Sequence, residues 1–466
     1  MESSWSLKNQ EKVPDGAPPF PMPTVVWDWL AREGFSTRES IEKLLNPSLK
    51  DMRDPNRLDG MKEAVQRLVR ARKENEKVVI YADFDLDGTS GLALLFDALK
   101  DLGFMNLDRY QPKRLSEGYG FHESAVEEIA SWGTSVIVTV DVGTAAPKTA
   151  EKAKALGLDL IITDHHLPSE ILPEAFAVIN PNKGTCVSGL GHLSGTGVAF
   201  YLVLALKREL EEQGLLAQPI DLKKYLDVFV IGTISDMVPL VDENRALVRH
   251  GLHQILKTDR PGLKALIDES GLSSRKCLTT QDIGFSIAPK LNALSRLEAD
   301  LMPIEVLMHD SPDAGDLIKR VFELNAERKE KQKLAEEIAF FEAEEQVENG
   351  VIFIYSKDFH KGVIGLVAVK LAQRFGVPAF VGSLHEDGTI SGSSRVPDPS
   401  PFHLVEILGE GSSHLLQFGG HKEAAGFKLN ESEASSFYES LKTSISKYDS
   451  SAPESYYDME VHLKDI

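Results

Sequence analysis

Three aspartates follow a short apolar stretch at alternating positions. Residues 78–82 are apolar and bounded by charge, which indicates a buried strand, and Asp83, Asp85 and Asp87 come directly after it. If the chain stays extended, these three side chains share one face. Three buried carboxylates repel one another and are costly to desolvate, so we expect a divalent cation to neutralise them. The alternative is an acidic turn that ends at Gly88.

Two later apolar stretches also end in residues that can bind metal. The pattern of residues 135–140 predicts a strand that ends at Asp141, and that of residues 158–162 predicts a strand that leads into Asp164, His165 and His166. Taken alone, each group has a simple explanation, such as turn chemistry or a chance pair of histidines. Their joint occurrence at successive strand ends favours a common site.

Asp236 follows one more apolar stretch, residues 228–235, whose pattern fits either a helix or a strand. Carboxylates with one or two imidazoles favour Mn²⁺ or Mg²⁺ over Zn²⁺, which prefers cysteine or more histidine. Several bridging acids predict two ions about 3.5–4 Å apart, the arrangement used for in-line phosphoryl hydrolysis.

Strands and helices alternate along the first half of the chain. We expect two short helices within residues 24–45, an amphipathic helix over residues 60–77, helices over residues 90–102 and 145–156, and a further strand over residues 176–179. This alternation is typical of an α/β fold with a doubly wound, mainly parallel sheet. Ligands of such sheets bind beyond the carboxyl ends of the strands, where the predicted polar groups lie.

The composition restricts the class of protein. The 466 residues suffice for at least two domains, and the net charge of −20 gives no support to a broad nucleic-acid surface, although a local basic groove can coexist with clustered acids. Cys186 and Cys277 are the only cysteines, which excludes a disulfide framework and suits a reducing compartment. No apolar run approaches the roughly 20 residues of a membrane span, so we expect a cytoplasmic protein.

The second half of the chain begins with a long helical pattern. Residues 311–350 would form a helix of roughly 50 Å that starts at a Ser311 cap. Its middle is nearly all charged, so we expect a connector between two domains, with an ordinary solvated helix as the alternative. The apolar positions expected in its later part are Leu334, Ile338 and Phe341.

A smaller αβ unit follows the long helix. It contains a glycine-rich loop at residues 419–422, which either binds an anion or is an ordinary turn.

The order of these motifs resembles that of one known family. The chain contains Asp83-Phe84-Asp85-Leu86-Asp87-Gly88, Val140-Asp141-Val142-Gly143, Asp164-His165-His166 and Gly419-Gly420-His421. This series is similar to that of the DHH phosphoesterases that carry a DHH-associated (DHHA1) domain, and the likeness extends over nearly everything from about Trp29 onward. With the motif at residues 232–240, the chain is most similar to the 5′→3′ single-strand-specific DNA exonucleases of that family.

The resemblance implies roles for the acids and histidines. Asp87 would be either a metal ligand or a turn residue. His166 would belong to the catalytic group beside the metal or the scissile phosphate, and Asp164 would orient its neighbours. The implied ligands of the two Mn²⁺ or Mg²⁺ ions are Asp83, Asp85, Asp141, His165 and Asp236.

The resemblance also implies a nucleic-acid substrate. Arg296 and Arg395 would hold phosphates, and the long helix would line a cleft that admits one strand. The enzyme would release 5′-mononucleotides from single-stranded DNA in recombination and repair, as a monomer with a helicase and a single-strand-binding protein as expected partners. The terminal nucleotide would meet His360, Ser394, Gly419, Gly420 and His421.

The expected domains follow the same resemblance. They are an N-terminal arm with helices (1–50), a DHH catalytic domain (51–260), a helical region that ends in the connector (261–350), a DHHA1 substrate-binding domain (351–447), and the start of an OB-like domain (448–466). The last range is expected because Met459, Val461 and Leu463 alternate as in a strand.

Two alternatives stay open. A DHH phosphodiesterase of short substrates, such as nanoRNA, pAp or cyclic dinucleotides, would usually be shorter and lack the long connector. An inactive scaffold, like the DHH relative in the eukaryotic replicative helicase, would bind a single strand without cutting it. Intact acids at every implied metal position argue against the scaffold.

Overall fold

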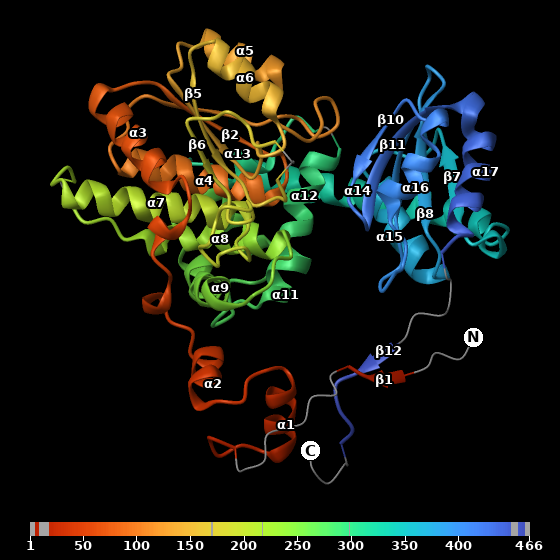
Figure 1. Ribbon diagram of the computed structural model, residues 1–466, viewed down its shortest axis with the longest axis horizontal. Coiled ribbons are helices and arrows are strands. Elements are labelled where there is room, and N and C mark those ends of the chain that lie inside the picture. Colours follow the sequence, from red (N-terminus) through yellow and green to blue (C-terminus); the bar gives the residue numbers. More distant parts are fainter. Residues whose placement is uncertain are drawn as a thin grey trace. The chain divides into compact units, whose positions relative to one another are not determined.

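The computed structural model describes residues 5–8, 18–168, 171–216, 218–297, 299–448 and 455–461 (Figure 1). The chain divides into a larger unit, residues 47–326, and a smaller unit, residues 1–46 with 327–466. None of the helices in these described ranges is both long and apolar enough to cross a membrane.

A five-stranded parallel sheet forms the centre of the larger unit, which confirms the predicted fold class. The strands lie in the order β3-β2-β4-β5-β6, so the order reverses between β2 and β4. Such a reversal is where ligands bind in sheets of this type. The strands are β2 (Val78–Ala82), β3 (Leu107–Tyr110), β4 (Val136–Val140), β5 (Asp159–Thr163) and β6 (Ala177–Ile179).

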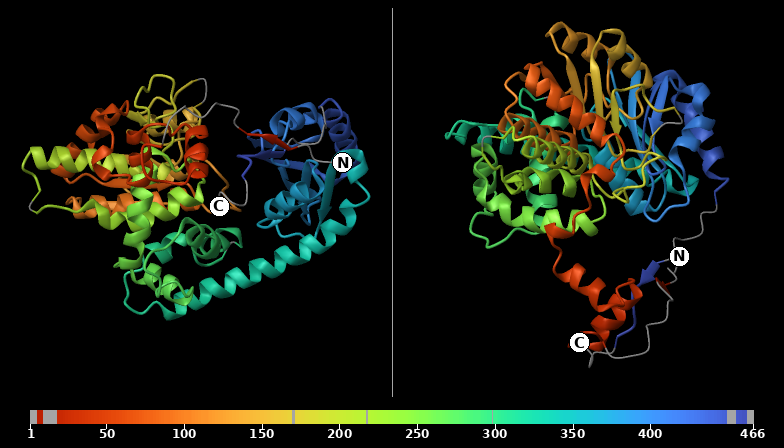
Figure 2. Two further views of the ribbon diagram at one scale, coloured as in Figure 1. Left: turned by 90° about the horizontal axis from the view of Figure 1, so that it is seen from below. Right: turned by 60° about the vertical axis from the view of Figure 1, so that its left-hand side comes forward.

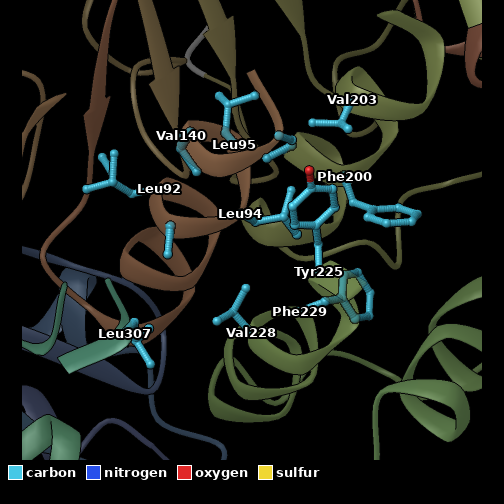
Figure 3. Close-up of a cluster of buried hydrophobic side chains, with 14 of the residues drawn as sticks. Leu92, Leu94, Leu95, Val140, Phe200, Val203, Tyr225, Val228, Phe229 and Leu307 are labelled. Carbon is cyan, nitrogen blue, oxygen red and sulfur yellow. The ribbon is translucent and has the colours of Figure 1, made fainter. Parts of the chain in front are cut away.

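Helices cover both faces of this sheet, because alternate strand residues point to opposite sides. Val79 and Tyr81 pack against α5 (Glu123–Ser131) and α6 (Pro147–Ala155) on one face. Val78 and Ile80 belong to the main core on the other face, with α3 (Met61–Glu74), α4 (Leu86–Asp101) and α7 (Gly195–Glu212). Figure 3 shows labelled side chains of this core: Leu92, Leu94, Leu95, Val140, Phe200, Val203, Tyr225, Val228, Phe229 and Leu307.

The aspartates after β2 do not lie on an extended strand, which corrects the sequence-based reasoning. The strand ends at Ala82, and α4 begins at Leu86, four residues before its predicted start. Asp85 caps this helix, because its Oδ1 accepts hydrogen bonds from the backbone N–H groups of Asp87 (2.9 Å) and Gly88 (3.0 Å). A helix start, and not the pleat of a strand, therefore holds the acids together.

The rest of the larger unit is helical. The stretch at residues 228–235 is a helix, which decides between the two predicted states. Leu263, Leu266 and Ile304 share the main core with β2, so the compact unit continues past the predicted boundary at residue 260. The helices are α8 (Leu226–Ser235), α9 (Asp242–Gln254), α10 (Pro261–Glu269), α11 (Thr280–Asp282), α12 (Ala288–Arg296) and α13 (Pro303–Leu307), with a π-helical turn at Ile283–Ile287.

The predicted long helix is present as α14 (Gly315–Ala343), and it passes from one unit into the other (Figure 2). It begins where the Asp313 carboxylate accepts from the Gly315 N–H (3.1 Å), so the predicted cap at Ser311 is wrong. Its first part contributes Ile318, Val321 and Leu324 to the main core. Its later part contributes Ala335, Ala339 and Ala343 to a core of the smaller unit.

The side chains on the later part of α14 confirm one of the three expected apolar positions and correct the other two. Ile338 is partly buried against this core. Leu334 and Phe341 are 51% and 79% exposed, and the alanines form the buried face instead. Small side chains allow the helix to lie close to its neighbours, and the apolar spacing alone does not reveal this.

The smaller unit contains a mixed sheet in the order β10-β11-β9-β8-β7, in which only β7 and β8 pair in parallel. Apolar side chains of α14 and α15 bury one face of it, and those of α16 and α17 bury the other. Its elements are β7 (Ile352–Ser356), α15 (Ile364–Phe375), β8 (Ala379–Leu384), β9 (Thr389–Arg395), α16 (Leu404–Glu410), β10 (Gln417–Gly420), β11 (Ala424–Asn430) and α17 (Ala434–Ile445).

The chain ends differ from the sequence-based expectations. The helices α1 (Thr24–Arg32) and α2 (Arg38–Leu45) are as predicted, but β1 (Trp5–Leu7) lies within the expected loose arm. It pairs in parallel with β12 (Ser455–Tyr457), which ends before the alternating residues Met459 and Val461. Residues 449–454 and 462–466 of the expected OB-like start, which include Leu463, lie outside the described residues.

We predict that the alanine face of α14 is sensitive to side-chain size. Ala339 is fully buried, so Ala339→Leu should lower the free energy of unfolding of the smaller unit by about 1–3 kcal/mol through overpacking. Phe341→Ala on the same helix is the control and should change it by less than about 0.5 kcal/mol. Urea denaturation measures both. Equal effects of the two substitutions would contradict the assigned buried face.

Candidate metal centre

Side chains from four separate elements meet at the carboxyl edge of the parallel sheet. Asp83 and Asp85 follow β2, Asp141 follows β4, the two histidines follow β5, and Asp236 is the C-terminal cap of α8. Three overlapping groups each offer donor atoms within 4.8 Å of one another. They are Asp83 with Asp85 and Asp141, Asp141 with His165 and His166, and Asp87 with His165 and Asp236.

Asp141 and His165 lie at the centre of this arrangement. His165 Nε2 is 3.2 Å from Asp141 Oδ1, 3.5 Å from Asp236 Oδ2 and 3.9 Å from Asp87 Oδ2. His166 Nδ1 is 3.8 Å from the same Asp141 oxygen. Asp141 adopts a left-handed backbone conformation (φ 63°), which is uncommon for a residue with a side chain and often marks a functional site.

Four buried atoms of this cluster have no hydrogen-bond partner in the described part of the chain: Asp83 Oδ1, Asp141 Oδ1, His165 Nε2 and Asp236 Oδ2. Although His165 Nε2 and Asp141 Oδ1 are close, they are not aligned as donor and acceptor. Buried polar atoms are almost always paired, so four unpaired ones together need an explanation. Oxygen and imidazole donors at this spacing fit divalent cations such as Mn²⁺ or Mg²⁺.

The electrostatics of the acids agree with this fit. Burial, followed by the charges of neighbouring carboxylates, raises the pKa of Asp83, Asp85 and Asp141. The same two causes raise the pKa of Asp236 to about 8. Without a cation, ionising all of these groups is therefore unfavourable, and binding a cation would displace protons from them.

Asp164 is saturated with hydrogen bonds and differs from the other acids. Its Oδ2 accepts from the Thr144 N–H (2.9 Å), and its Oδ1 accepts from the His165 N–H (2.8 Å) and lies 2.8 Å from His166 Nδ1. Burial would raise the pKa of Asp164, but these contacts outweigh it and lower that pKa. The hydrogen bond to Asp164 and the charge of that carboxylate raise the pKa of His166 to about 9, although the burial of His166 alone would lower it.

Two asparagines after β6 hold the backbone of the histidine pair, and the sequence analysis missed them. Asn180 Nδ2 donates to the carbonyl oxygen of His166 (2.8 Å) and to Thr144 Oγ1 (3.0 Å). Asn182 Nδ2 donates to the carbonyl oxygen of His165 (2.5 Å). The signal that could have found them is their position, because they follow a strand at the same edge as the acids.

Arg114 is a third residue that sequence reasoning missed. It lies between β3 and α5, with its guanidinium carbon 5.0 Å from the centre of the Phe84 ring. Burial lowers its pKa, and the nearby charges of Asp85 and Asp83 oppose this shift. The same segment supplies Tyr119, whose hydroxyl is 3.4 Å from His166 Nδ1. The motif Glu117-Gly118-Tyr119-Gly120 in this segment is part of the family resemblance, but the resemblance implied no role for the segment in the centre.

The remaining predicted site residues lie outside the acid cluster. Arg296 is the last residue of α12 in the larger unit, and the others are in the smaller unit. Arg395 Nη1 donates to Ser393 Oγ (3.0 Å) and to the carbonyl oxygen of Ser394 (2.8 Å). A side chain added at Gly365, in the first turn of α15, would come within 3.5 Å of Arg395 Nη2, so this guanidinium lies beside a helix N-terminus. That combination suits an anion.

The other residues of the smaller unit that we expected to contact the substrate differ in how exposed they are. Gly419 and Gly420 form part of the exposed edge strand β10, and His421 follows it, also exposed. His360 Nδ1 accepts from the Gly362 N–H (3.1 Å) just before α15. Ser394 is fully buried and its hydroxyl donates to the Ala425 carbonyl (3.1 Å), so we leave it out of the candidate phosphate-binding residues.

The sequence matches two known domains. Residues 77–233 match the N-terminal domain of the DHH family, and residues 348–447 match the DHHA1 domain. The parallel sheet and the acid–histidine cluster at its edge thus define a DHH protein with a DHHA1 domain.

Proteins that align with nearly the whole chain identify a narrower family within this class. The chain is 37% identical to the single-stranded-DNA-specific exonuclease RecJ of Bacillus subtilis, over 91% of this chain and 53% of that protein. It is 34% identical to the protein of the same name from Escherichia coli, over 92% of this chain and 76% of that one. The chain therefore belongs to the RecJ family, and it spans about half the length of the Bacillus relative.

Solved structures agree with this assignment. A crystal structure of exonuclease RecJ bound to manganese matches with a TM-score of 0.74 and 30% identity, over 84% of this chain and 96% of that one. RecJ from Thermus thermophilus in complex with Mn²⁺ matches with a TM-score of 0.78 and 27% identity, over 94% of this chain and 60% of that one.

We predict that Gly195 cannot be replaced without weakening metal binding. A Cβ atom at Gly195, the first residue of α7, would lie 2.4 Å from Asp141 Cβ and 2.5 Å from Asp141 Oδ1. Gly195→Ala should therefore displace Asp141 and lower Mn²⁺ affinity by roughly 10- to 100-fold, as measured by calorimetry.

Gly184→Ala is the matched control, because Gly184 is exposed and a Cβ there would meet nothing within 4 Å. Its Mn²⁺ affinity should equal that of the unmodified protein. A folded Gly195→Ala variant with unchanged Mn²⁺ affinity would contradict the assigned role of Asp141.

Proposed function

We propose that this chain is a metal-dependent exonuclease that degrades single-stranded DNA from the 5′ end and releases 5′-mononucleotides. The observation that carries the proposal is the group of four buried donor atoms at the edge of the parallel sheet that have no partner among the residues the structure describes. The names of the relatives support the choice of substrate, since they are single-stranded-DNA-specific exonucleases. Solved RecJ structures with Mn²⁺ and with Mg²⁺ support the choice of cofactor.

The proposed ligands of the two cations are Asp83, Asp85, Asp141, His165 and Asp236. When bound, the ions supply a water nucleophile of lowered pKa and neutralise charge on the phosphoryl group. Asp141 would help to hold both ions, because it belongs to two of the three donor groups. Asp164 orients the two histidines and is not itself a ligand.

Two side chains near the acids are proposed to contact the scissile phosphate. The first is His166, whose ring is fixed by its contact with Asp164. The second is Arg114, whose guanidinium interacts electrostatically with Asp85 and Asp83 and would offset the negative charge of an arriving phosphate.

Other side chains are proposed to hold further phosphates of the DNA. Arg395 is the best-supported residue for this role because of its place beside the N-terminus of α15. Arg296, His360 and the exposed residues 419–421 complete the proposed set. A few local cations of this kind can bind DNA even though the chain carries a net charge of −20.

The expected biological role and partners of the protein follow from its proposed substrate. DNA degradation from one end serves recombination and repair, and it needs a single strand, which a helicase would supply and a single-strand-binding protein would cover. These two partners, action as a monomer and a cytoplasmic location remain our predictions.

Digestion of labelled oligonucleotides tests the proposal. With Mn²⁺ present, a 5′-labelled single strand should release labelled mononucleotide at once, whereas a 3′-labelled strand should shorten progressively. Asp141→Asn should lower the rate by at least roughly 100-fold, because a bridging ligand is lost. Asp268→Asn, an exposed aspartate on α10, is the charge-matched control and should cut normally.

Nuclease activity that survives Asp141→Asn or excess chelator would contradict the proposal. Faster hydrolysis of a dinucleotide than of a long strand would favour the phosphodiesterase alternative, and Mn²⁺ binding without any cutting would favour the scaffold.

The salt dependence of DNA binding tests the phosphate-binding role of Arg395. In the Asp141→Asn background, Arg395→Gln should reduce the slope of log affinity against log salt concentration by about one, because one phosphate contact is lost. Fluorescence anisotropy with a labelled single strand measures this slope. Arg374→Gln, an exposed arginine at the other end of α15, should leave it unchanged. Equal slopes for all three proteins would remove Arg395 from the proposed site.

A further inference from the structure

A short segment with strained ends, residues 237–242, follows Asp236. Met237 (φ 61°) and Asp242 (φ 40°) both adopt the left-handed backbone conformation, although both carry side chains. Such strain persists only where surrounding contacts fix the backbone. The structure describes all six residues of this strained segment, and each of them is exposed or half-buried. Their own packing gives the segment little support, so the contacts that fix it come from elsewhere.

Asn244, in the first turn of α9, supplies one of these contacts. It is completely buried, and its Nδ2 donates to the carbonyl oxygen of Pro239 (3.0 Å), inside the strained segment. The same Nδ2 donates to the carbonyl oxygen of His192 (2.5 Å), in the entry loop of α7, residues 190–194. Because both partners are acceptors, only the N–H₂ group of the amide can face them. One side chain therefore joins two segments that are far apart in the sequence.

Glu243, the preceding residue, anchors the start of α9. It is 3% exposed, and its Oε1 accepts from the Arg53 N–H (3.1 Å). Its Oε2 lies 2.5 Å from Arg53 Nη1 and 2.9 Å from His192 Nε2. Burial would raise the pKa of Glu243, but its contacts with His192 and Arg53 outweigh burial and lower that pKa. Arg53 also binds Asp242 (3.0 Å), so its guanidinium supplies the positive charge that this pair of acids requires. These contacts hold Asn244 against both segments.

Each of the two joined segments leads to a proposed metal ligand. Asp236 directly precedes the strained segment, and its Oδ2 has no partner in the described part of the chain, so the position of that oxygen depends on the backbone. The entry loop leads into Gly195, whose backbone lies so close to Asp141 that a Cβ would clash at 2.4 Å. Asp141 Oδ1 and Asp236 Oδ2 lie 3.2 Å and 3.5 Å from the same atom, His165 Nε2.

We propose that Asn244 is a positioning residue of the metal centre: by joining the strained segment to the entry loop, it sets the position of Asp236 relative to Asp141. It acts through these two ligands and not on the substrate. The inference rests on the proposed function in taking Asp141 and Asp236 as ligands, but its first test requires neither a metal ion nor nuclease activity.

The first test is hydrogen exchange of the full chain in excess chelator. Asn244→Leu nearly keeps the size of the side chain but removes the N–H₂ group, so two carbonyl groups lose their donor. Backbone N–H exchange in the strained segment and in the entry loop should become roughly 3- to 10-fold faster. Unchanged exchange in either segment would overturn the proposal.

Ile255→Val is the control for a general loss of stability. Ile255 is fully buried at the other end of α9, and the loss of one methylene should cost about 0.5–1.5 kcal/mol without touching either segment. Exchange in both segments should stay as in the unmodified protein.

The second test is calorimetric titration with Mn²⁺. Asn244→Leu should keep the number of ions bound per chain and lower their affinity by roughly 3- to 30-fold, because the ligands are displaced and not removed. Ile255→Val should bind Mn²⁺ as the unmodified protein does. Glu243→Gln removes the charge that holds Arg53 but keeps an acceptor for the Arg53 N–H. It should weaken Mn²⁺ binding in the same direction, which gives a second route if Asn244→Leu folds poorly.

Unchanged Mn²⁺ affinity in folded Asn244→Leu, or in Glu243→Gln where Asn244→Leu does not fold, would overturn the proposal. Equal weakening by Asn244→Leu and Ile255→Val would overturn it as well, because a general loss of stability would explain both. If Asp141→Asn and Asp236→Asn bind Mn²⁺ as the unmodified protein does, the proposed function fails instead. The exchange test of Asn244 is still decided in that case.

Discussion

The structure depends on one unfavourable interaction, the burial of several carboxylates at one edge of a sheet with too few hydrogen-bond donors to satisfy them. Within the described part of the chain, Asp83, Asp141 and Asp236 each keep a buried oxygen without a partner, and burial raises the pKa of all three. A protein accepts such a cost when a ligand removes it. Divalent cations do so best, because they bring two charges and prefer oxygen donors.

The rest of the larger unit fixes where these acids lie. The strand order reverses between β2 and β4, so that the chain segments that follow these strands diverge and leave space for ligands. The polar side chains that are not proposed as ligands then hold the ligands in place. Asp164 and Asn180 bond the segments after β4, β5 and β6 to one another. Precise positions for a few donors thus require several fully satisfied hydrogen-bonding residues.

Sequence patterns were sufficient for the fold and for most of the centre, because strand periodicity and strand-end acids are local signals. They failed where tertiary contacts decide. Asp87 accepts hydrogen bonds from backbone N–H groups about a hundred residues away, and Arg114 lies in a segment without a periodic pattern. The buried alanine face of α14 was hidden by larger apolar residues that are exposed. The short edge strand β3, whose residues are all half-buried, lacked the apolar run of its neighbours.

The central claim is that the unpartnered acids at this edge of the sheet bind paired divalent cations. Anomalous diffraction from crystals grown with Mn²⁺ tests it most directly. The account predicts two peaks about 3.5–4 Å apart, with Asp141 in contact with both. Peaks that do not touch Asp141, or crystals in which this cluster binds no manganese, would contradict it.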